Sequence, residues 1–266
     1  MMNGTTRTVW CTLLLVGLLG LSTAACQKLK ARDQLNKGVQ AYKAAKYQVA
    51  IEHFKTAVDL DPQLLNARLY LATAYANQFV PGSEAEENLK IGEEAIAQFQ
   101  KVLETDPNNV GSIGGIANLY FQMKRMDDAK EFYRRQISLD PNNPEAYYSV
   151  GVIDWTLTYQ PRMFLKTRLK LRPEDPIKDA TERQALAGRN APLVDEGMQM
   201  LNKAIELRPD YDDAMAYLNL LYREKADLAE TEEERQEHLK VADMWIDKTM
   251  EIKKEKAQKA SSSGQG

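Results

Sequence analysis

The sequence predicts an all-α fold in which helix pairs stack side by side as an α-solenoid. Four segments, beginning at Ala41, Glu93, Met126 and Asp195, repeat one pattern of residue types. Each runs from a small residue to an aromatic residue or leucine four positions later, and a proline follows eight positions after that. Small and apolar residues at this spacing form one stripe along a helix, and internal repetition of helical segments is typical of solenoids.

The same segments indicate where the helices begin and end. Proline stops a helix because it has no amide hydrogen and clashes with the preceding turn. Each repeated proline is therefore expected to separate one helix from the next. Helix starts are expected where capping residues occur. Those places are Asn143 before Pro144, Ser83 with Glu86, and Thr231 with Glu234.

This pattern resembles the signature of the tetratricopeptide repeat, a helix-turn-helix unit of about 34 residues. The resemblance covers residues 31 to about 252. It implies a right-handed α-solenoid of about five repeats, and we expect the solenoid domain at residues 31–256. The repeats are expected at about residues 31–64, 65–109, 110–143, 144–211 and 212–256.

Repeats 2, 4 and 5 are predicted to contain insertions. In repeats 1 and 3 the small residue of the first helix lies 12 positions before that of the second, as from Gly38 to Ala50. This spacing is 23 in repeats 2 and 5, and 46 from Gly151 to Gly197 in repeat 4. Longer helices can absorb the smaller excess. The larger one, residues 159–192, contains four prolines, so we expect it to leave the solenoid, and we expect the array to fold without it.

The N-terminus has the pattern of an export signal. Residues 1–25 contain one basic residue, Arg7, followed by an apolar run that ends in small residues, as in a signal peptide. An uncleaved transmembrane anchor is the alternative, because about 17 apolar residues is the short limit for spanning a bilayer. Residues 26–30 are expected to form a lipidated linker, and residues 257–266, with several serines and glycines, a disordered tail.

The residues around Cys26 resemble a bacterial lipoprotein signal, in which the cysteine becomes the mature N-terminus and carries lipid. The resemblance implies lipidation of Cys26 and attachment to a membrane through that lipid. Thr23 stands where the motif usually has leucine, and ordinary cleavage that leaves a free thiol is the alternative. Gln27 resembles the outer-membrane sorting preference of such lipoproteins. The expected location is therefore the cell envelope, facing the periplasm, with a lipid anchor in the outer membrane.

Composition and motifs argue against catalysis and against nucleic-acid binding. The chain has 38 acidic and 35 basic residues and a formal net charge of −3, and a mildly acidic protein is a poor nucleic-acid binder. The sequence contains no GxSxG, GxGxxG, P-loop, CxxC or HExxH motif. We therefore expect no enzyme activity, no cofactor and no metal site.

The expected function is a scaffold that binds a protein or peptide partner in the groove of the solenoid, in envelope assembly or secretion. The family resemblance implies that certain positions of the first helix of each repeat line this groove. An accessory lipoprotein that binds carbohydrate or partners an enzyme is the alternative, with aromatic residues as sugar platforms. The groove positions are Tyr42, Asn77, Asn118, Phe121, Gln122, Tyr148, Trp155 and Arg223.

Two further features refine this expectation. Leu35 and Val39 stand where chaperone-binding members of the family use polar residues to clamp a C-terminal carboxylate, so no such clamp is expected. The glycine-rich run from Gly111 to Gly115 weakens a helix, because each glycine costs about 1 kcal/mol relative to alanine. Close packing or a groove wall is the expected reason for these glycines.

The predicted insertion carries a basic patch. Residues 162–172 contain five basic residues and no acidic one, interleaved with apolar residues. In one reading the apolar residues pack on the solenoid while the charges are solvated. In the other, the patch contacts an acidic partner or an anionic membrane surface. The basic residues are Arg162, Lys166, Arg168, Lys170 and Arg172.

Overall fold

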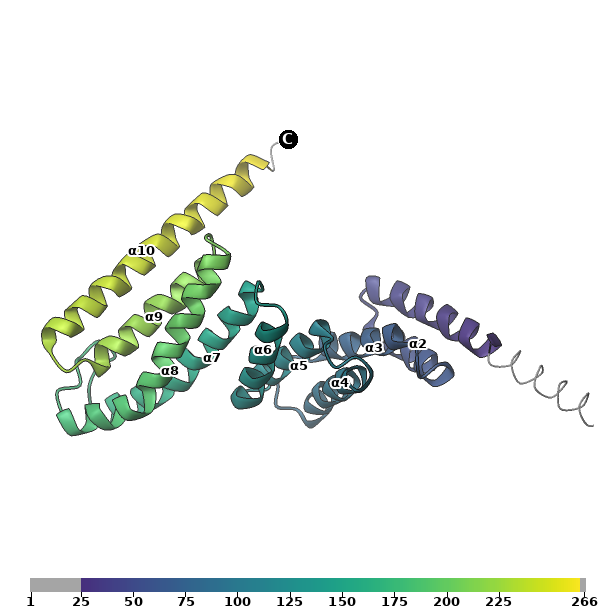
Figure 1. Cartoon of the computed structure of the whole chain (residues 1–266), viewed down its shortest axis with the longest axis horizontal. Coiled ribbons are helices and arrows are strands. Elements are labelled where there is room, and N and C mark those ends of the chain that lie inside the picture. The colour runs from purple at the N-terminus through teal and green to yellow at the C-terminus, as the bar shows by residue number, and fades with distance from the viewer. Residues whose placement is uncertain (1–24, 264–266) are drawn as a thin grey trace, which may run out of the picture. The chain divides into compact units, whose positions relative to one another are not determined.

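The computed structural model describes residues 25–263, and all regular secondary structure in that range is helical (Figure 1). The prediction of an all-α fold is confirmed. The chain divides into two compact units, Met1–Met123 and Lys124–Gly266, and each is described by itself. Residues 1–24, which make up nearly all of the predicted signal peptide, lie outside the described residues.

The first unit is built from successive helices joined by short turns. A helix at residues 25–43 is followed by α2 (Tyr47–Leu60), α3 (Leu65–Gln78), α4 (Glu86–Thr105) and α5 (Val110–Gln122). α3 packs against α2 and α4, and α5 packs against α4 and α3. The first helices of two successive repeats, α3 and α5, therefore lie next to one another.

The apolar stripe that predicts these helices is buried between them. Phe54 of α2 is fully buried, and a Cβ atom on Gly38 would lie 2.4 Å from its ring. Gly115 of α5 has the same relation to Phe99 of α4, at 2.7 Å. Only glycine allows an aromatic ring to lie this close to a helix backbone, so Gly115 confirms the close packing expected of the glycine-rich run.

The second unit also consists of packed helices. It contains α6 (Met126–Leu139), α7 (Pro144–Arg168), α8 (Ala180–Leu207), α9 (Asp212–Leu228) and α10 (Glu232–Ser263). α7, α8 and α9 pack against one another, α6 packs against α7, and α10 packs against α9 (Figure 1). α7 and α8 are the two helices of the fourth repeat.

Glycine again sets the closest approach in the second unit. A Cβ atom on Gly151 of α7 would lie 2.5 Å from Cγ of Leu201, and one on Gly197 of α8 would lie 2.9 Å from Leu221. Asn219 occupies the corresponding position of α9. It is buried and donates a hydrogen bond of 2.5 Å to the carbonyl of Ala242 in α10, so this polar residue also joins two helices.

Two of the three predicted helix starts are confirmed. Oδ1 of Asn143 accepts a hydrogen bond of 3.0 Å from the amide of Glu145 at the start of α7. Thr231 and Glu234 form the reciprocal pair of a capping box, with bonds of 3.2 and 3.3 Å between side chains and amides.

The predicted cap at Ser83 is wrong, since α4 starts after Ala85 and no side chain caps it. The buried side chain of Asn88 instead holds the connection between α3 and α4 in place. It accepts a hydrogen bond of 2.8 Å from the amide of Val80 and donates one of 3.0 Å to the carbonyl of Ser83. These bonds satisfy backbone groups that a non-helical segment leaves open.

The predicted excursion at residues 159–192 is wrong for most of its length. α7 continues through Pro161 to Arg168, and α8 begins at Ala180 and continues through Pro192, so only residues 169–179 are not helical. Nδ2 of the Asn190 side chain donates a hydrogen bond of 2.9 Å to the carbonyl of Thr158. This carbonyl lies in the turn of α7 before Pro161, which has no amide hydrogen to donate within the helix. The excess residues lengthen both helices of the repeat.

Two basic residues of the predicted patch belong to a buried ionic cluster. Nε of Arg162 lies 2.8 Å from Glu224, and its Nη1 lies 2.8 Å from Asp227. Nζ of Lys166 lies 2.6 Å from Asp227 and donates a hydrogen bond of 2.6 Å to the carbonyl of Pro173. All four charged side chains are buried. The assignment of Arg162 and Lys166 to an exposed patch is therefore wrong, because acidic residues of α9 neutralise both.

The other basic residues of the patch are exposed, but two of them are paired. Arg168 lies 2.5 Å from Glu182, and Arg172 lies 2.8 Å from Asp175. Lys170 is exposed in the turn that follows α7. The segment also packs its own small apolar cluster of Leu165, Ile177 and Leu186. The segment is therefore packed within the second unit. The expectation that the array folds without residues 159–192 stays a prediction.

Both ends of the described chain are helical where other structure was predicted. Residues 26–30, the predicted lipidated linker, lie within the helix at residues 25–43. α10 continues to Ser263, and the predicted tail at residues 257–266 is wrong as far as that residue. Lys, Gln and Ala have high helix propensity, which explains why both segments extend a neighbouring helix.

Burial changes the protonation of the ionic residues in the second unit. Burial, together with nearby Asp227, raises the pKa of Glu224 to about 7, against the opposing attraction of Arg162. A second cluster joins α6 to α7 and α8, where Lys130 pairs with Asp154 and lies 2.9 Å from Glu196. Burial raises the pKa of Asp154 to about 6. Both carboxyl groups therefore change charge near neutral pH.

We predict that Gly151→Ala destabilises the protein by about 1–3 kcal/mol, because the new methyl group overlaps Leu201. Gly188→Ala is the matched control in α8, since a Cβ atom there would meet nothing within 4 Å. The control is expected to raise stability by up to about 1 kcal/mol through helix propensity. Urea unfolding of both variants measures the difference. Equal stability of the two variants would contradict the close packing at Gly151.

We also predict a pH-dependent difference between wild type and Glu224→Gln. A carboxyl whose pKa is about 7 in the folded state and near its ordinary value in the unfolded state binds more protons when folded. Its stabilising contribution is therefore complete below the ordinary pKa and is lost as the pH rises through 7. The glutamine variant does not titrate, so it should gain about 2–3 kcal/mol relative to wild type over this range.

Urea midpoints of wild type and Glu224→Gln at mildly acidic, neutral and mildly alkaline pH measure this change. Comparing the two proteins cancels the titration of the remaining groups, including Asp154. If the glutamine variant instead loses stability relative to wild type as the pH rises, the ionised pair of Glu224 with Arg162 is stabilising, and the prediction is wrong.

Candidate functional site

The first unit has a groove of about 480 Å³ between α3 and α5. Three of the predicted binding residues line it, Asn77 on α3 with Asn118 and Gln122 on α5. Asn77 and Asn118 are exposed, and Nε2 of Gln122 donates a hydrogen bond to Oδ1 of Asn118 one helical turn away. The structure therefore brings these three amides together along one surface.

The rest of this groove, which we call the amide groove, is lined by small and apolar residues. Gly111, Gly114 and Gly115 of α5 contribute backbone without side chains, and the ring of Phe99 lies among them. The glycines keep the groove open, because a larger side chain on the same face of α5 would project into it. This confirms the groove wall that the glycine-rich sequence predicts.

Two other predicted residues of the first unit differ in their placement. Tyr42 lies beside Asn77, whose Nδ2 donates a hydrogen bond to the tyrosine hydroxyl. The Tyr42 ring also contacts that of Tyr47, with 5.4 Å between centroids. Phe121 is half-buried and does not line the amide groove. Tyr42 does not line the amide groove but contacts it through its hydrogen bond with Asn77.

The second unit has a separate cavity of about 500 Å³ at α7, α9 and α10. Trp155 and Arg223, both predicted binding residues, line it together with Tyr159, Leu220 and Leu239. Arg223 is paired with Asp243 of α10 at 2.7 Å. We call this cavity the aromatic cavity, because the two aromatic rings and two leucines supply most of its apolar surface.

Tyr148, the remaining predicted residue, packs beside the aromatic cavity. Its ring centroid lies 4.9 Å from that of Tyr211 and 5.7 Å from that of Tyr217. Trp155 also contacts Tyr217, at 5.3 Å, and Tyr159, at 5.0 Å. Tyr148 and Trp155 are therefore both half-buried in a continuous aromatic cluster.

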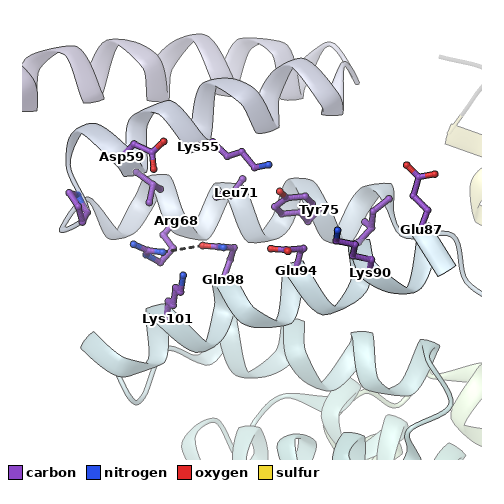
Figure 2. A pocket seen from close by; sticks show the side chains of 13 residues that line it. Lys55, Asp59, Arg68, Leu71, Tyr75, Glu87, Lys90, Glu94, Gln98 and Lys101 are labelled. Carbon is purple, nitrogen blue, oxygen red and sulfur yellow. Dashed lines mark hydrogen bonds between the residues drawn. The ribbon is translucent and has the colours of Figure 1, made fainter.

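A third groove, of about 750 Å³, lies between α2, α3 and α4, and none of the predicted residues lines it. Figure 2 shows charged side chains of both signs along it, including Lys55 and Asp59 from α2 and Glu94 from α4. The hydrogen bond that Lys55 donates to the Tyr75 hydroxyl, together with the charge of nearby Glu94, raises the pKa of Lys55. The groove is lined by four basic and three acidic side chains, so charges of the two signs are mixed along it.

The sequence reasoning missed the acidic partners Glu224 and Asp227. They lie three residues apart on α9, and a helix of this kind places such residues on one face. Their neighbours on that face are buried leucines, Leu218 and Leu221. Two acidic residues on the same face as buried leucines were the sequence signal for a buried ionic cluster. Their partners, Arg162 and Lys166, lie four residues apart on one face of α7.

The described residues carry no indication of a metal centre or a membrane-spanning helix. In residues 25–263, no three or more His, Cys, Asp or Glu side chains are grouped so that they could hold a metal ion. Within the same range, no helix combines the length and the apolarity needed to cross a membrane. Cys26 is a free, exposed thiol at the start of the first described helix.

Comparison with known proteins identifies the type of repeat. Residues 92–150 match the family model described as tetratricopeptide repeat. The chain is 29% identical over 117 residues to Hsp70-Hsp90 organizing protein 1 of Glycine max, which covers 43% of this chain and 18% of that protein. The chain spans less than a fifth of the length of the curated relatives that it matches.

Solved structures agree with the fold. MamA from Desulfovibrio magneticus RS-1 is similar with a TM-score of 0.59 and 17% identity, over 85% of this chain and 96% of that one. YrrB, titled a TPR protein with an unusual peptide-binding site, is similar with a TM-score of 0.53 and 16% identity, over 82% of this chain and 84% of that one. At these identities the similarity shows the fold alone.

Helix pairing, buried small residues and the structural neighbours lead to the same result. The chain has the fold of the tetratricopeptide repeat solenoids, and its residues 92–150 carry the sequence signature of that repeat family.

Proposed function

We propose that this protein is a non-catalytic scaffold that binds an extended peptide segment of a partner protein in the amide groove. The observation that carries the proposal is the alignment of Asn77, Asn118 and Gln122 along one groove. A side-chain amide both donates and accepts hydrogen bonds, as does every peptide unit of an extended chain. Amides on two neighbouring helices can therefore hold a peptide backbone with little dependence on its sequence.

Sequence preference in this proposal comes from apolar contacts. The amide groove includes Leu69, Leu119 and Phe99, which suit apolar side chains of the peptide. In the second unit the aromatic cavity presents Trp155 and Tyr159, and aromatic residues contribute strongly to binding energy at protein interfaces. Apolar side chains of an extended partner segment suit the amide groove and the aromatic cavity, each taken by itself.

The similarity to other repeat proteins supports the general class. YrrB is described by its title as having a peptide-binding site, and the Glycine max relative is named as an organizing protein for two chaperones. Binding of proteins or peptides by this fold is therefore known outside this chain. The proposal requires no catalytic residue.

We further propose that the protein is exported and held at a membrane by lipid on Cys26. The apolar segment before Cys26 resembles a lipoprotein signal, and the cysteine is exposed. Two acyl chains are enough for stable anchoring, at about 0.8 kcal/mol for each buried methylene. The scaffold would then face the periplasm from the outer membrane and serve envelope assembly or secretion.

The amide groove predicts the effect of Asn77→Ala combined with Asn118→Ala. Wild type is first used to select binders from a displayed library of unstructured peptides. Loss of two amides should weaken the selected peptides about tenfold, because each net hydrogen bond contributes about 1 kcal/mol or less. Both residues are exposed, so helicity and melting should be unchanged.

Lys90→Ala combined with Lys101→Ala is the matched control, since both lysines line the charged groove shown in Figure 2. The control should bind the selected peptides as wild type does. Peptides that bind both variants equally well, or a wild-type protein that selects no peptide, would show that the amide groove is not the binding site.

The anchoring proposal predicts that Cys26→Ser releases the protein from the membrane fraction into the soluble fraction. Serine has no thiol to accept the lipid, so the anchoring contribution is lost. Fractionation of cells and the mass of the mature wild-type protein are the two measurements. A wild-type protein that is already soluble, or whose mass includes no lipid, contradicts the proposal.

A further inference from the structure

The first described helix and the turn after it carry basic residues that mostly have no acidic partner among the described residues. In the segment at residues 162–172, by contrast, most basic residues are paired. Residues 26–46 contain six basic residues and one acidic residue, Asp33, in a chain with a net charge of −3. The stretch therefore has a net charge of +5, and the remainder of the chain has one of −8. Its basic residues are Lys28, Lys30, Arg32, Lys37, Lys43 and Lys46.

All six basic side chains are exposed. Among the residues that the structure describes, only Lys37 has an acidic partner, Asp33, at 2.7 Å and largely in solvent. The segment at residues 162–172 differs, because Arg162 and Lys166 are buried in ion pairs. A positive surface with so few partners of its own is free to attract anions.

The position of this charge favours a membrane over a soluble anion. Cys26, Leu29 and Lys30 lie within one turn of the helix, where residues three and four apart are neighbours. Leu29 is 70% exposed, so an apolar side chain stands beside the cysteine and a lysine. Ala31 and Gly38 are buried on the other side of the helix, and Gly38 packs against Phe54.

We infer that the exposed basic face of residues 26–46 docks on an anionic phospholipid surface. The inference rests on the proposed membrane attachment and adds a second contact to it. Leu29 would enter the interface, and the basic side chains would contact phosphate and other anionic headgroups. The helix at residues 25–43 would then connect the lipid on Cys26 directly to the first unit and hold that unit near the surface.

Each basic residue near an anionic leaflet strengthens binding about fivefold, and the effect falls within a Debye length as salt increases. Three of the six charges lie close to the cysteine, at Lys28, Lys30 and Arg32. Replacing these three with glutamine should therefore weaken the anionic contribution by between about tenfold and about a hundredfold.

The test uses the full chain with Cys26→Ser, so that no acyl chain contributes. Binding is measured by flotation with vesicles of phosphatidylcholine alone and of phosphatidylcholine mixed with phosphatidylglycerol, at low and high salt. The readout is the ratio of binding to the two vesicle types, because any apolar contact acts on both. The charge variant is K28Q/K30Q/R32Q, and the matched control is R168Q/K170Q/R172Q, which removes the same charge from other exposed positions.

The expected result is a preference for anionic vesicles that salt suppresses, that the control keeps and that the first-helix variant loses. A chain without this preference overturns the inference, as does equal loss in both variants, which would mark a general charge effect. The inference is also overturned if only R168Q/K170Q/R172Q loses the preference. Lipidation is judged separately, from the mass of the wild-type protein, so failure of the anchor and failure of the basic face remain distinguishable.

Discussion

Close approach between neighbouring helices is the constraint on which both units depend. A single helix of this chain cannot bury its apolar stripe alone, so it must lie against the next helix. Gly38 and Gly151 allow that contact, because each leaves room for the side chain of the following helix, Phe54 or Leu201. The amide groove and the aromatic cavity are consequences of the same packing, since both form where helices are held at fixed spacing.

The paired helices were predictable from the sequence because their signals are local. The residues of the stripe and the capping groups at Asn143 and Thr231 act within one or two turns. The course of residues 159–192 was not predictable in this way. A proline usually ends a helix, but Pro161 and Pro192 lie inside helices whose other contacts hold them. Those contacts join α7 to α8 and both helices to α9, and they link residues that lie far apart in the sequence, as in the hydrogen bond from Asn190 to the carbonyl of Thr158.

The same distinction applies to the candidate site. Family positions correctly gathered Asn77, Asn118 and Gln122, because they depend only on the register of two helices. The charge pattern of residues 162–172 was misleading, since a basic residue gives no sign of whether it is solvated or paired. Glu224 and Asp227 decide that question. Long-range pairing of charges therefore limits what a run of basic residues can indicate.

The basic residues of the buried ionic cluster and those of residues 26–46 have different roles. Burying four charges is costly unless each finds a partner, and replacing them with apolar residues would serve stability equally well. Their effect is to hold the lengthened end of α7 in one arrangement against α9. The exposed charges of residues 26–46 have no such task, and they remain available for contacts outside the chain.

The connection at residues 169–179 is the longest non-helical stretch of the described chain, yet its backbone is firmly held. Lys166 donates to the carbonyl of Pro173, Arg235 to that of Glu174 and Arg183 to that of Ile177, at 2.6 to 3.0 Å. Proteases cut where a loop can leave the surface and extend into their active site. Three long cationic side chains that hydrogen-bond to three carbonyls of this connection oppose that movement, so limited digestion should spare this loop and leave the second unit in one piece.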